Sequence, residues 1–160
     1  MRIEEAMKEE EFDTLPKLLK RNCELFGDQT AEREKDYGIW NPYTWREVYE
    51  QVKYLCLGLI SLGFQKGEKA TLLGESEPEL YWSELAVLSA GGVATAVYPD
   101  CTSLEVEYIF KDSESVLAIC EDQEQVDKFL ELKDRLLYRW SGCIFRAGWV
   151  FKFVHIGELV

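Results

Sequence analysis

The sequence predicts an α/β protein with a parallel, doubly wound sheet of βαβ units, preceded by a short N-terminal helix and a hairpin. Three short apolar runs, at 69–74, 93–99 and 115–120, are expected to be strands. Helical segments at 76–92 and 102–111 separate them, and this alternation with short links is typical of a parallel sheet. The runs are apolar throughout rather than alternating, which indicates a sheet covered on both faces.

The expected N-terminal elements have local signals of their own. Residues 14–27 have the pattern of a helix, with Pro16 in the first turn and Gly27 at the end. The segment 29–43 is expected to form two short strands around a turn at residues 36–38. The sheet should therefore be preceded by one helix and one hairpin.

Two further helices have clear amphipathic patterns. The first spans 44–62, with these side chains expected to face inward: Trp45, Val48, Tyr49, Val52, Leu55, Cys56, Leu59 and Ile60. The second lies within 121–136, with Val126, Phe129, Leu130 and Leu136 inward. Three helix starts also have the spacing of a capping box, at Thr44–Glu47, Ser76–Glu79 and Thr102–Glu105.

Charge and cysteine content exclude several classes of protein. The net charge is −12 and the isoelectric point is about 4.6, which argues against binding to nucleic acid or to anionic lipid. Five widely spaced cysteines suggest neither a disulfide framework nor a zinc site. No signal peptide or membrane-spanning run is visible. We expect a cytoplasmic protein, and a peripheral association of the intact enzyme with membranes stays open.

Two segments carry a resemblance to a known family. YTWREV (43–48) resembles the first core motif of the AMP-forming adenylate superfamily, and LSAGGVATAVYPD (88–100) resembles the second. With the segment between them, the similarity covers about residues 12–136 and is greatest to bacterial long-chain fatty-acid–CoA ligases. The resemblance implies the N-terminal portion of an adenylate-forming domain over residues 13–136, after an acidic leader at 1–12.

The resemblance implies ATP, Mg²⁺ and coenzyme A as cofactors of the intact enzyme. The family joins a carboxylate to ATP and then transfers the acyl group to the coenzyme A thiol. Its phosphate-binding loop, rich in Ser, Thr and Gly, and its C-terminal catalytic lysine have no counterpart in this sequence. Gly91 and Gly92 do not replace that loop, because they precede a strand rather than a helix N-terminus. We therefore expect no cofactor to be bound by this chain alone.

Acidic side chains follow the predicted strands at Glu75, Asp100, Glu121 and Asp122. Ligands of open α/β sheets bind beyond the carboxyl ends of the strands, so these carboxylates are candidates for Mg²⁺ ligands. Solvated loop carboxylates are far commoner than metal sites. No residue is therefore assigned as a metal ligand.

Four other residues have chemistry to weigh. His155 has no identifiable Ser or Cys partner, and Cys101 has no nearby cation that would lower its pKa. Tyr81 and Trp82 could line an acyl pocket, but packing in the core is the favoured interpretation. No catalytic or cofactor-binding residue is assigned.

The last segment, 137–160, differs in composition from the rest. Six of its 24 residues are aromatic, against 15 of the first 136, and its net charge is +2 against −14. We interpret 137–160 as a divergent tail and hypothesise a frameshift near codon 136. The alternative is a divergent strand at 149–154, where WVFKFV alternates.

Two functions follow from these observations. The first is a truncated fragment of a long-chain fatty-acid–CoA ligase that is inactive alone, with the missing remainder as its partner. The second is a stand-alone interaction or regulatory module on the same scaffold, pairing with an intact ligase. In either case the uncovered apolar surface favours self-association.

Overall fold

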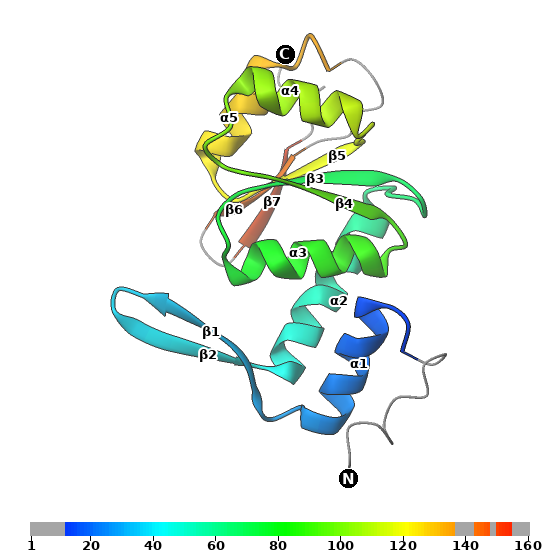
Figure 1. Ribbon diagram of the computed structural model, residues 1–160, viewed down its shortest axis with the longest axis vertical. Helices are drawn as coiled ribbons and strands as arrows, with labels where there is room; N and C mark the ends of the chain where they lie inside the picture. The colour runs from blue at the N-terminus through cyan, green and yellow to red at the C-terminus, as the bar shows by residue number, and fades with distance from the viewer. Residues whose placement is uncertain (1–11, 137–142, 148–149, 155–160) are drawn as a thin grey trace.

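The computed structural model describes residues 12–136, 143–147 and 150–154. Helices and strands alternate as the sequence predicts, and the α/β fold class is confirmed (Figure 1). The elements in chain order are α1 (Leu15–Phe26), β1 (Thr30–Asp36), β2 (Ile39–Thr44), α2 (Trp45–Ser61), β3 (Lys69–Leu73), α3 (Pro78–Ser89), β4 (Val93–Val97), α4 (Ser103–Asp112), β5 (Leu117–Cys120), α5 (Gln123–Glu131), β6 (Cys143–Ala147) and β7 (Val150–Val154).

The main sheet has the strand order β4-β3-β5-β6-β7. β3 pairs in parallel with both β4 and β5, β5 pairs in parallel with β6, and β7 is antiparallel to β6. The chain passes from β3 to β4 on one side and then crosses to β5 on the other. The strand order therefore reverses between β3 and β5, which is where open α/β sheets usually receive ligands. α3 covers one face of the sheet, and α4 and α5 cover the other (Figure 1).

The alternation of side chains along β3 and β5 divides the core into two clusters. Leu72 and Ile119 belong to the cluster shared with α1, α2 and α3. Leu73 and Cys120 belong to the cluster under α4 and α5. The two central strands are thus buried on both faces, as predicted. β4 differs because it lies at the sheet edge, where Val93 is half exposed, so the prediction of full burial is wrong for this strand.

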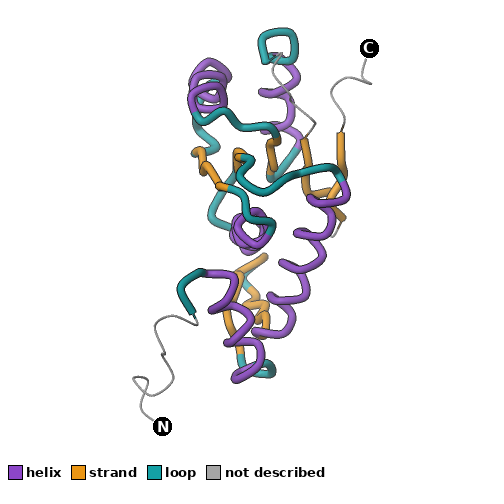
Figure 2. The backbone as a smooth tube through the Cα atoms, turned by 90° about the vertical axis from the view of Figure 1, so that its right-hand side faces the viewer, coloured by secondary structure: helices purple, strands orange, loops and turns teal. Residues whose placement is uncertain are grey.

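α2 confirms most of its predicted apolar stripe. Val48, Val52 and Leu59 are buried, but Ile60 is half exposed, contrary to the prediction. Ile60 lies in the last turn of the helix, which ends at Ser61. The tube in Figure 2 shows α2 as a long helix running from the hairpin end of the molecule toward the sheet.

Two of the three predicted capping boxes form. At the start of α2 the Thr44 hydroxyl accepts the Glu47 N–H at 3.3 Å, and the Glu47 carboxylate accepts the Thr44 N–H at 2.8 Å. The box at Thr102–Glu105 also forms. The box at Ser76–Glu79 is wrong: the helix starts at Pro78, so its N-cap is Glu77, and the Glu79 side chain is buried.

The hairpin of β1 and β2 projects from the body of the molecule (Figure 1). Its turn is formed by Tyr37 and Gly38, with φ values of 45° and 83°. Positive φ at both central residues gives the turn the twist that antiparallel strands need. The predicted turn is confirmed, and its tip is open to solvent, with Tyr37 98% exposed.

The structure describes part of the predicted tail as backbone. β7 falls within the run 149–154 that the alternative interpretation assigned to a strand, and β6 extends the main sheet beside β5. Residues 1–11 of the predicted leader lie outside the described residues, and so does His155. The division of the chain into a domain portion at 13–136 and a divergent tail at 137–160 stays a prediction. Among the described helices, none has the length and apolar character needed to cross a membrane.

Candidate functional site

The carboxyl edge of the sheet, between β3 and β5, is the first place to look for a ligand. Glu121 follows β5, and its carboxylate accepts the backbone N–H of Glu75 at 2.6 Å. A Cβ atom on Gly74 would lie 2.7 Å from the Cβ of Glu121. Gly74 thus lets the Glu121 side chain lie across the end of β3, so a carboxylate occupies the crevice where the strand order reverses.

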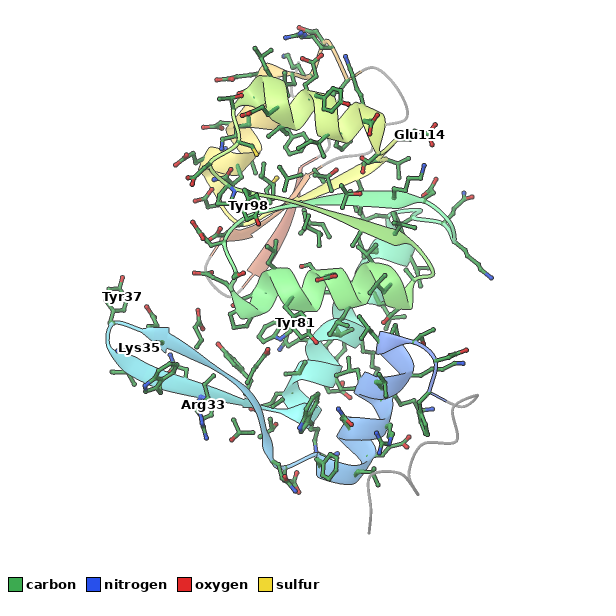
Figure 3. The ribbon with its side chains drawn as sticks, in the orientation of Figure 1. Arg33, Lys35, Tyr37, Tyr81, Tyr98 and Glu114 are labelled. Atoms are coloured by element: carbon green, nitrogen blue, oxygen red, sulfur yellow. The ribbon has the colours of Figure 1, made fainter. Side chains whose placement is uncertain are left out.

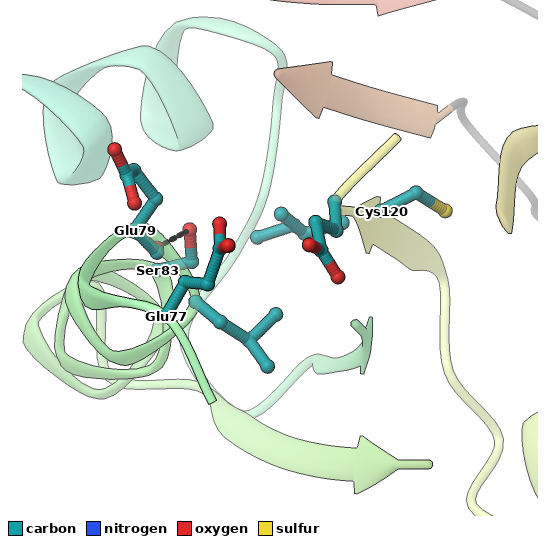
Figure 4. A pocket seen from close by; sticks show the side chains of 7 residues that line it. Glu77, Glu79, Ser83 and Cys120 are labelled. Atoms are coloured by element: carbon teal, nitrogen blue, oxygen red, sulfur yellow. Dashed lines mark hydrogen bonds between the residues drawn. The ribbon is translucent and has the colours of Figure 1, made fainter. Parts of the chain in front are cut away.

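The space left beside Glu121 is very small. The hollow has a volume of about 10 Å³, and its lining residues are Glu77, Glu79, Leu80, Ser83, Ile119, Cys120 and Glu121. Figure 4 shows the side chains that fill it, including the Ser83 hydroxyl, which donates to the carbonyl of Glu79 at 2.7 Å. A hollow of this size holds about one water molecule. It cannot admit a nucleotide.

The other strand ends are occupied by local contacts. Asp122 caps α5, accepting the Gln125 N–H at 3.0 Å. The Lys128 ammonium donates to the carbonyl of Pro99, just after β4. Lys128 thus brings a positive charge to an edge that the sequence predicted to be acidic. The sequence could not show this contact, because the two residues are 29 positions apart and belong to different elements.

Among the described residues, the carboxylates weighed as Mg²⁺ ligands form no group of three with oxygens close together, although Glu121 reaches the backbone of Glu75. In the part of the chain that the structure describes, the group able to hold a metal ion consists of Glu34, Glu77 and Glu79, whose oxygens lie within 4.8 Å of one another. These residues come from the hairpin and the start of α3. Sequence analysis missed them because nothing in the local pattern brings β1 to α3.

A buried tryptophan joins the hairpin to α3. The Trp82 indole N–H donates to the Glu32 carboxylate, and the Tyr43 ring meets the Trp82 ring edge-on, with 5.1 Å between ring centroids. Tyr43 donates its hydroxyl proton to Glu34 at 2.9 Å. The predicted core position of Trp82 is confirmed, since it is 4% exposed. The prediction is wrong for Tyr81, which is 47% exposed because α3 is uncovered on that side (Figure 3).

Burial and nearby carboxylates raise the pKa of Glu32. Burial is the largest cause, and the charges of Glu79 and Glu34 add to it. The hydrogen bond from Trp82 acts in the opposite direction and lowers the pKa. Glu32 is therefore a carboxyl group whose ionised form is disfavoured in the folded protein.

The remaining candidates have structural roles. Gly91 and Gly92 join α3 to β4, as expected, and a Cβ on Gly92 would lie 2.5 Å from the Phe64 ring. Cys101 is partly buried and packs against the core cluster under α4 and α5. Gly91 and Gly92 do not lie at a helix N-terminus, and the N-terminus of α4, which follows Cys101, is occupied by its own capping box.

A larger hollow of about 690 Å³ lies at the opposite edge of the sheet, beside Lys69, Lys111 and Arg135. The three cations are paired with carboxylates within the described residues. Lys69 contacts Glu114, while Lys111 and Arg135 contact Glu107 at 2.6 and 2.8 Å. Each cation of this hollow is therefore already in contact with a carboxylate, and two of them share Glu107. It also ends at Leu136, the last residue described before β6.

Comparison with protein families gives a match over most of the chain. The family model for AMP-binding enzymes matches residues 19–144, which extends into β6. The long-chain-fatty-acid–CoA ligase heimdall of Drosophila melanogaster is 29% identical over 127 residues, covering 77% of this chain and 19% of that protein. FadD15 of Mycobacterium bovis, another long-chain-fatty-acid–CoA ligase, is 30% identical over 95 residues, covering 59% and 16%.

Solved structures show the same fold. The anthranilate CoA ligase AuaEII, in complex with anthranoyl-AMP, superposes with a TM-score of 0.74 at 22% identity, covering 82% of this chain and 24% of that chain. The N-terminal subdomain of Klebsiella oxytoca NpsA superposes with a TM-score of 0.61, covering 68% and 26%. This chain spans less than a fifth of the length of the two curated relatives described above.

Proposed function

Because the chain belongs to the family of AMP-binding enzymes, we propose that it supplies the N-terminal scaffold of a long-chain fatty-acid–CoA ligase. The proposal is supported by the two ligases of that name that match it and by the fold shared with solved CoA ligases. The scaffold contributes the sheet and its covering helices. The reacting groups are contributed by other segments of such an enzyme.

The reaction of such a ligase has two steps. The fatty-acid carboxylate attacks the α-phosphate of ATP, forming an acyl-adenylate and releasing pyrophosphate. The coenzyme A thiol then attacks the acyl carbonyl, forming the thioester and releasing AMP. ATP carries several negative charges, which Mg²⁺ and positively charged protein groups neutralise. No described residue of this chain is assigned to either step.

One observation carries the proposal that this chain alone is inactive. The carboxyl edge between β3 and β5, where a sheet of this type would receive a nucleotide, leaves about 10 Å³ beside Glu121. The groups around that space include the carboxylates of Glu77, Glu79 and Glu121, which repel phosphate. We expect residues 1–160 to bind neither ATP nor an acyl-adenylate.

Calorimetric titration of residues 1–160 with ATP and Mg²⁺ tests this proposal, with an intact long-chain fatty-acid–CoA ligase as the positive control. No saturable heat is expected from the short chain. An assay for acyl-CoA formed from palmitate should likewise give the background rate. Saturable binding at one ATP per chain, or turnover above background, would show that the site is complete within these residues.

A second function, an interaction module that pairs with an intact ligase, is favoured by the uncovered edge at β4. Tyr98, directly after this strand, is 82% exposed, and Leu104 and Tyr108 on the following helix α4 are 64% and 69% exposed. Copurification with an intact ligase at a fixed ratio, lost in Leu104→Asp, would support the module. A chain that copurifies equally with and without this substitution would argue against pairing through the exposed side chains of α4.

A further inference from the structure

The main sheet ends at β4 with an edge that no described strand covers. β4 pairs with β3 on one side, and β7 forms the other end of the sheet (Figure 1). Such an edge presents a row of unpaired backbone groups, and many proteins protect it with lysine or proline. The sequence of β7, VFKFV, has a lysine at its centre, whereas that of β4, VATAV, contains neither a charge nor a proline. The β4 edge is therefore open to pairing with another strand.

The hydrogen bonds to β3 show which backbone groups of β4 point outward. The Val93 N–H donates to the Glu68 carbonyl at 2.9 Å, so the backbone groups of Val93 point toward β3. Because successive residues of a strand point these groups to opposite sides, those of Thr95 also point toward β3, and those of Ala94 and Ala96 point away from it. In the part of the chain that the structure describes, no strand lies on that outer side of β4. The edge thus offers the N–H and C=O groups of Ala94 and Ala96.

These groups are self-complementary when two β4 strands from two copies of the chain run antiparallel. If Thr95 lies opposite Thr95 of the other copy, Ala94 lies opposite Ala96 and exchanges both backbone hydrogen bonds with it. The two-fold axis then repeats the exchange, as in any isologous contact. The two Thr95 side chains meet at the axis, and threonine pairs are among the favourable cross-strand pairs.

Neighbouring registers need backbone groups that are already bonded within the chain. A register shifted toward the N-terminal end of β4 would need the Gly92 N–H, which donates to the Val87 carbonyl at 3.0 Å. A register shifted toward the C-terminal end would need the carbonyl of Tyr98, labelled in Figure 3, which accepts the Cys101 N–H at 3.1 Å. The geometry therefore favours the register centred on Thr95.

The charges at the two ends of β4 are also complementary. Lys66 lies beside Gly91, just before the strand, since a Cβ on Gly91 would lie 3.0 Å from the Lys66 Cγ. Asp100 follows the strand. Lys66 and Asp100 are both exposed, and neither forms an ion pair with another described residue. An antiparallel pair brings the Lys66 end of one strand next to the Asp100 end of the other, at both ends of the contact.

We propose that the β4 edge is a dimerisation surface whose partner is a second copy of this chain. The two β4 strands pair antiparallel about Thr95 and join the two sheets into one. This inference goes beyond the proposed function, because neither the scaffold nor the module requires two copies. The paired strands are short, and the net charge of −12 on each copy opposes association, so the dissociation constant is expected in the micromolar range.

Sedimentation equilibrium of residues 1–160 over micromolar concentrations tests the proposal, and a monomer–dimer equilibrium is expected. Ala96→Pro removes an outward N–H but keeps the bonds to β3, because proline is tolerated where the N–H of an edge strand faces solvent. It should raise the dissociation constant by about tenfold or more. A wild-type chain that stays monomeric, or a dimer that Ala96→Pro does not weaken, would overturn the proposal. A chain that associates only with an added intact ligase would also overturn it.

Exchange of the two end charges provides a second test that does not depend on how proline affects folding. Asp100→Lys and Lys66→Asp should each raise the dissociation constant by about three- to tenfold, because like charges then meet at both ends of the contact. The double variant restores opposite charges and should return the constant to within about twofold of the wild-type value. Lys20→Asp, at an exposed lysine of α1, is the matched control and should leave the dimer intact. A double variant that dimerises as weakly as the single variants would overturn the proposal.

Discussion

Two glutamates near the hairpin have opposite electrostatic environments. Glu32 on β1 is half-buried among other carboxylates, and burial raises its pKa. Glu47 in the first turn of α2 is exposed and accepts hydrogen bonds from the N–H and the hydroxyl of Thr44, both at 2.8 Å. These bonds, the backbone one first, lower the pKa of Glu47. The difference shows that the surroundings, and not the residue type, decide which protonation state the fold prefers.

The two glutamates should respond to pH in opposite directions. The capping contribution of Glu47 is complete above the unfolded pKa of 4.5 and is lost as the pH falls through the lowered value. The contribution of a protonated Glu32 is complete below 4.5 and is lost as the pH rises through the raised value. Substitutions at the two sites should therefore have pH dependences of opposite sign.

The largest effect on the free energy of unfolding is expected from a buried apolar residue of α3. Because this residue carries no charge, it is the pH-independent reference for the two glutamates. Leu85 is 2% exposed in the cluster shared with α1 and α2. Leu85→Ala should lower the free energy of unfolding by about 2–5 kcal/mol, measured by urea denaturation. Leu104→Ala, at an exposed leucine of α4, should change it by less than about 0.5 kcal/mol. Because no charge is involved, the loss at Leu85 should be equal at pH 5.5 and 7.5. A strong pH dependence there would mean that the acidic contact and the apolar core are not separable.

A smaller effect is expected at Trp82, which belongs to the core and also donates its indole N–H to Glu32. Trp82→Phe removes the N–H that donates to the Glu32 carboxylate and should lower the free energy of unfolding by about 1–3 kcal/mol. The hydrogen bond favours the ionised form of Glu32, so the loss should be greater at pH values above the raised pKa of Glu32 than below it. A double-mutant cycle with Glu32→Ala, which removes the acceptor, measures the coupling by urea denaturation. Additive effects of the two substitutions would show that the hydrogen bond contributes nothing to the contact.

Thr44→Ala removes the hydroxyl of the capping box at the start of α2 and should lower the free energy of unfolding by about 0.5–2 kcal/mol. Without the hydroxyl bond the pKa of Glu47 moves only part of the way back toward its ordinary value, since the backbone N–H of residue 44 still donates, and the loss should shrink as the pH falls. Thr14→Ala is the matched control, since the Thr14 side chain makes no capping hydrogen bond at α1. Urea denaturation of both variants checks the difference. Equal losses at Thr14 and Thr44 would contradict the role of the hydroxyl.

Contacts that are local in sequence could be predicted, and contacts between distant elements could not. The boxes at Thr44 and Thr102 need residues three positions apart, and the central strands are marked by their continuous apolar runs. The bond from Trp82 to Glu32 joins residues 50 positions apart. The contact of Glu121 with Glu75 spans 46 positions, and no local pattern indicated that it closes the carboxyl edge of the sheet.

The one failed capping box shows that a local pattern can also mislead, and it leads to the smallest predicted effect. Ser76 and Glu79 have the required spacing, but Pro78 fits the first turn of a helix and places the start two residues later than the pattern implied. Ser76→Ala should therefore change the free energy of unfolding by less than about 0.5 kcal/mol. Thr102→Ala, at a box that does form, should cost about 0.5–2 kcal/mol in the same denaturation experiment. A loss at Ser76 as large as that at Thr102 would place the N-cap of α3 at Ser76 in solution, contrary to the start at Pro78.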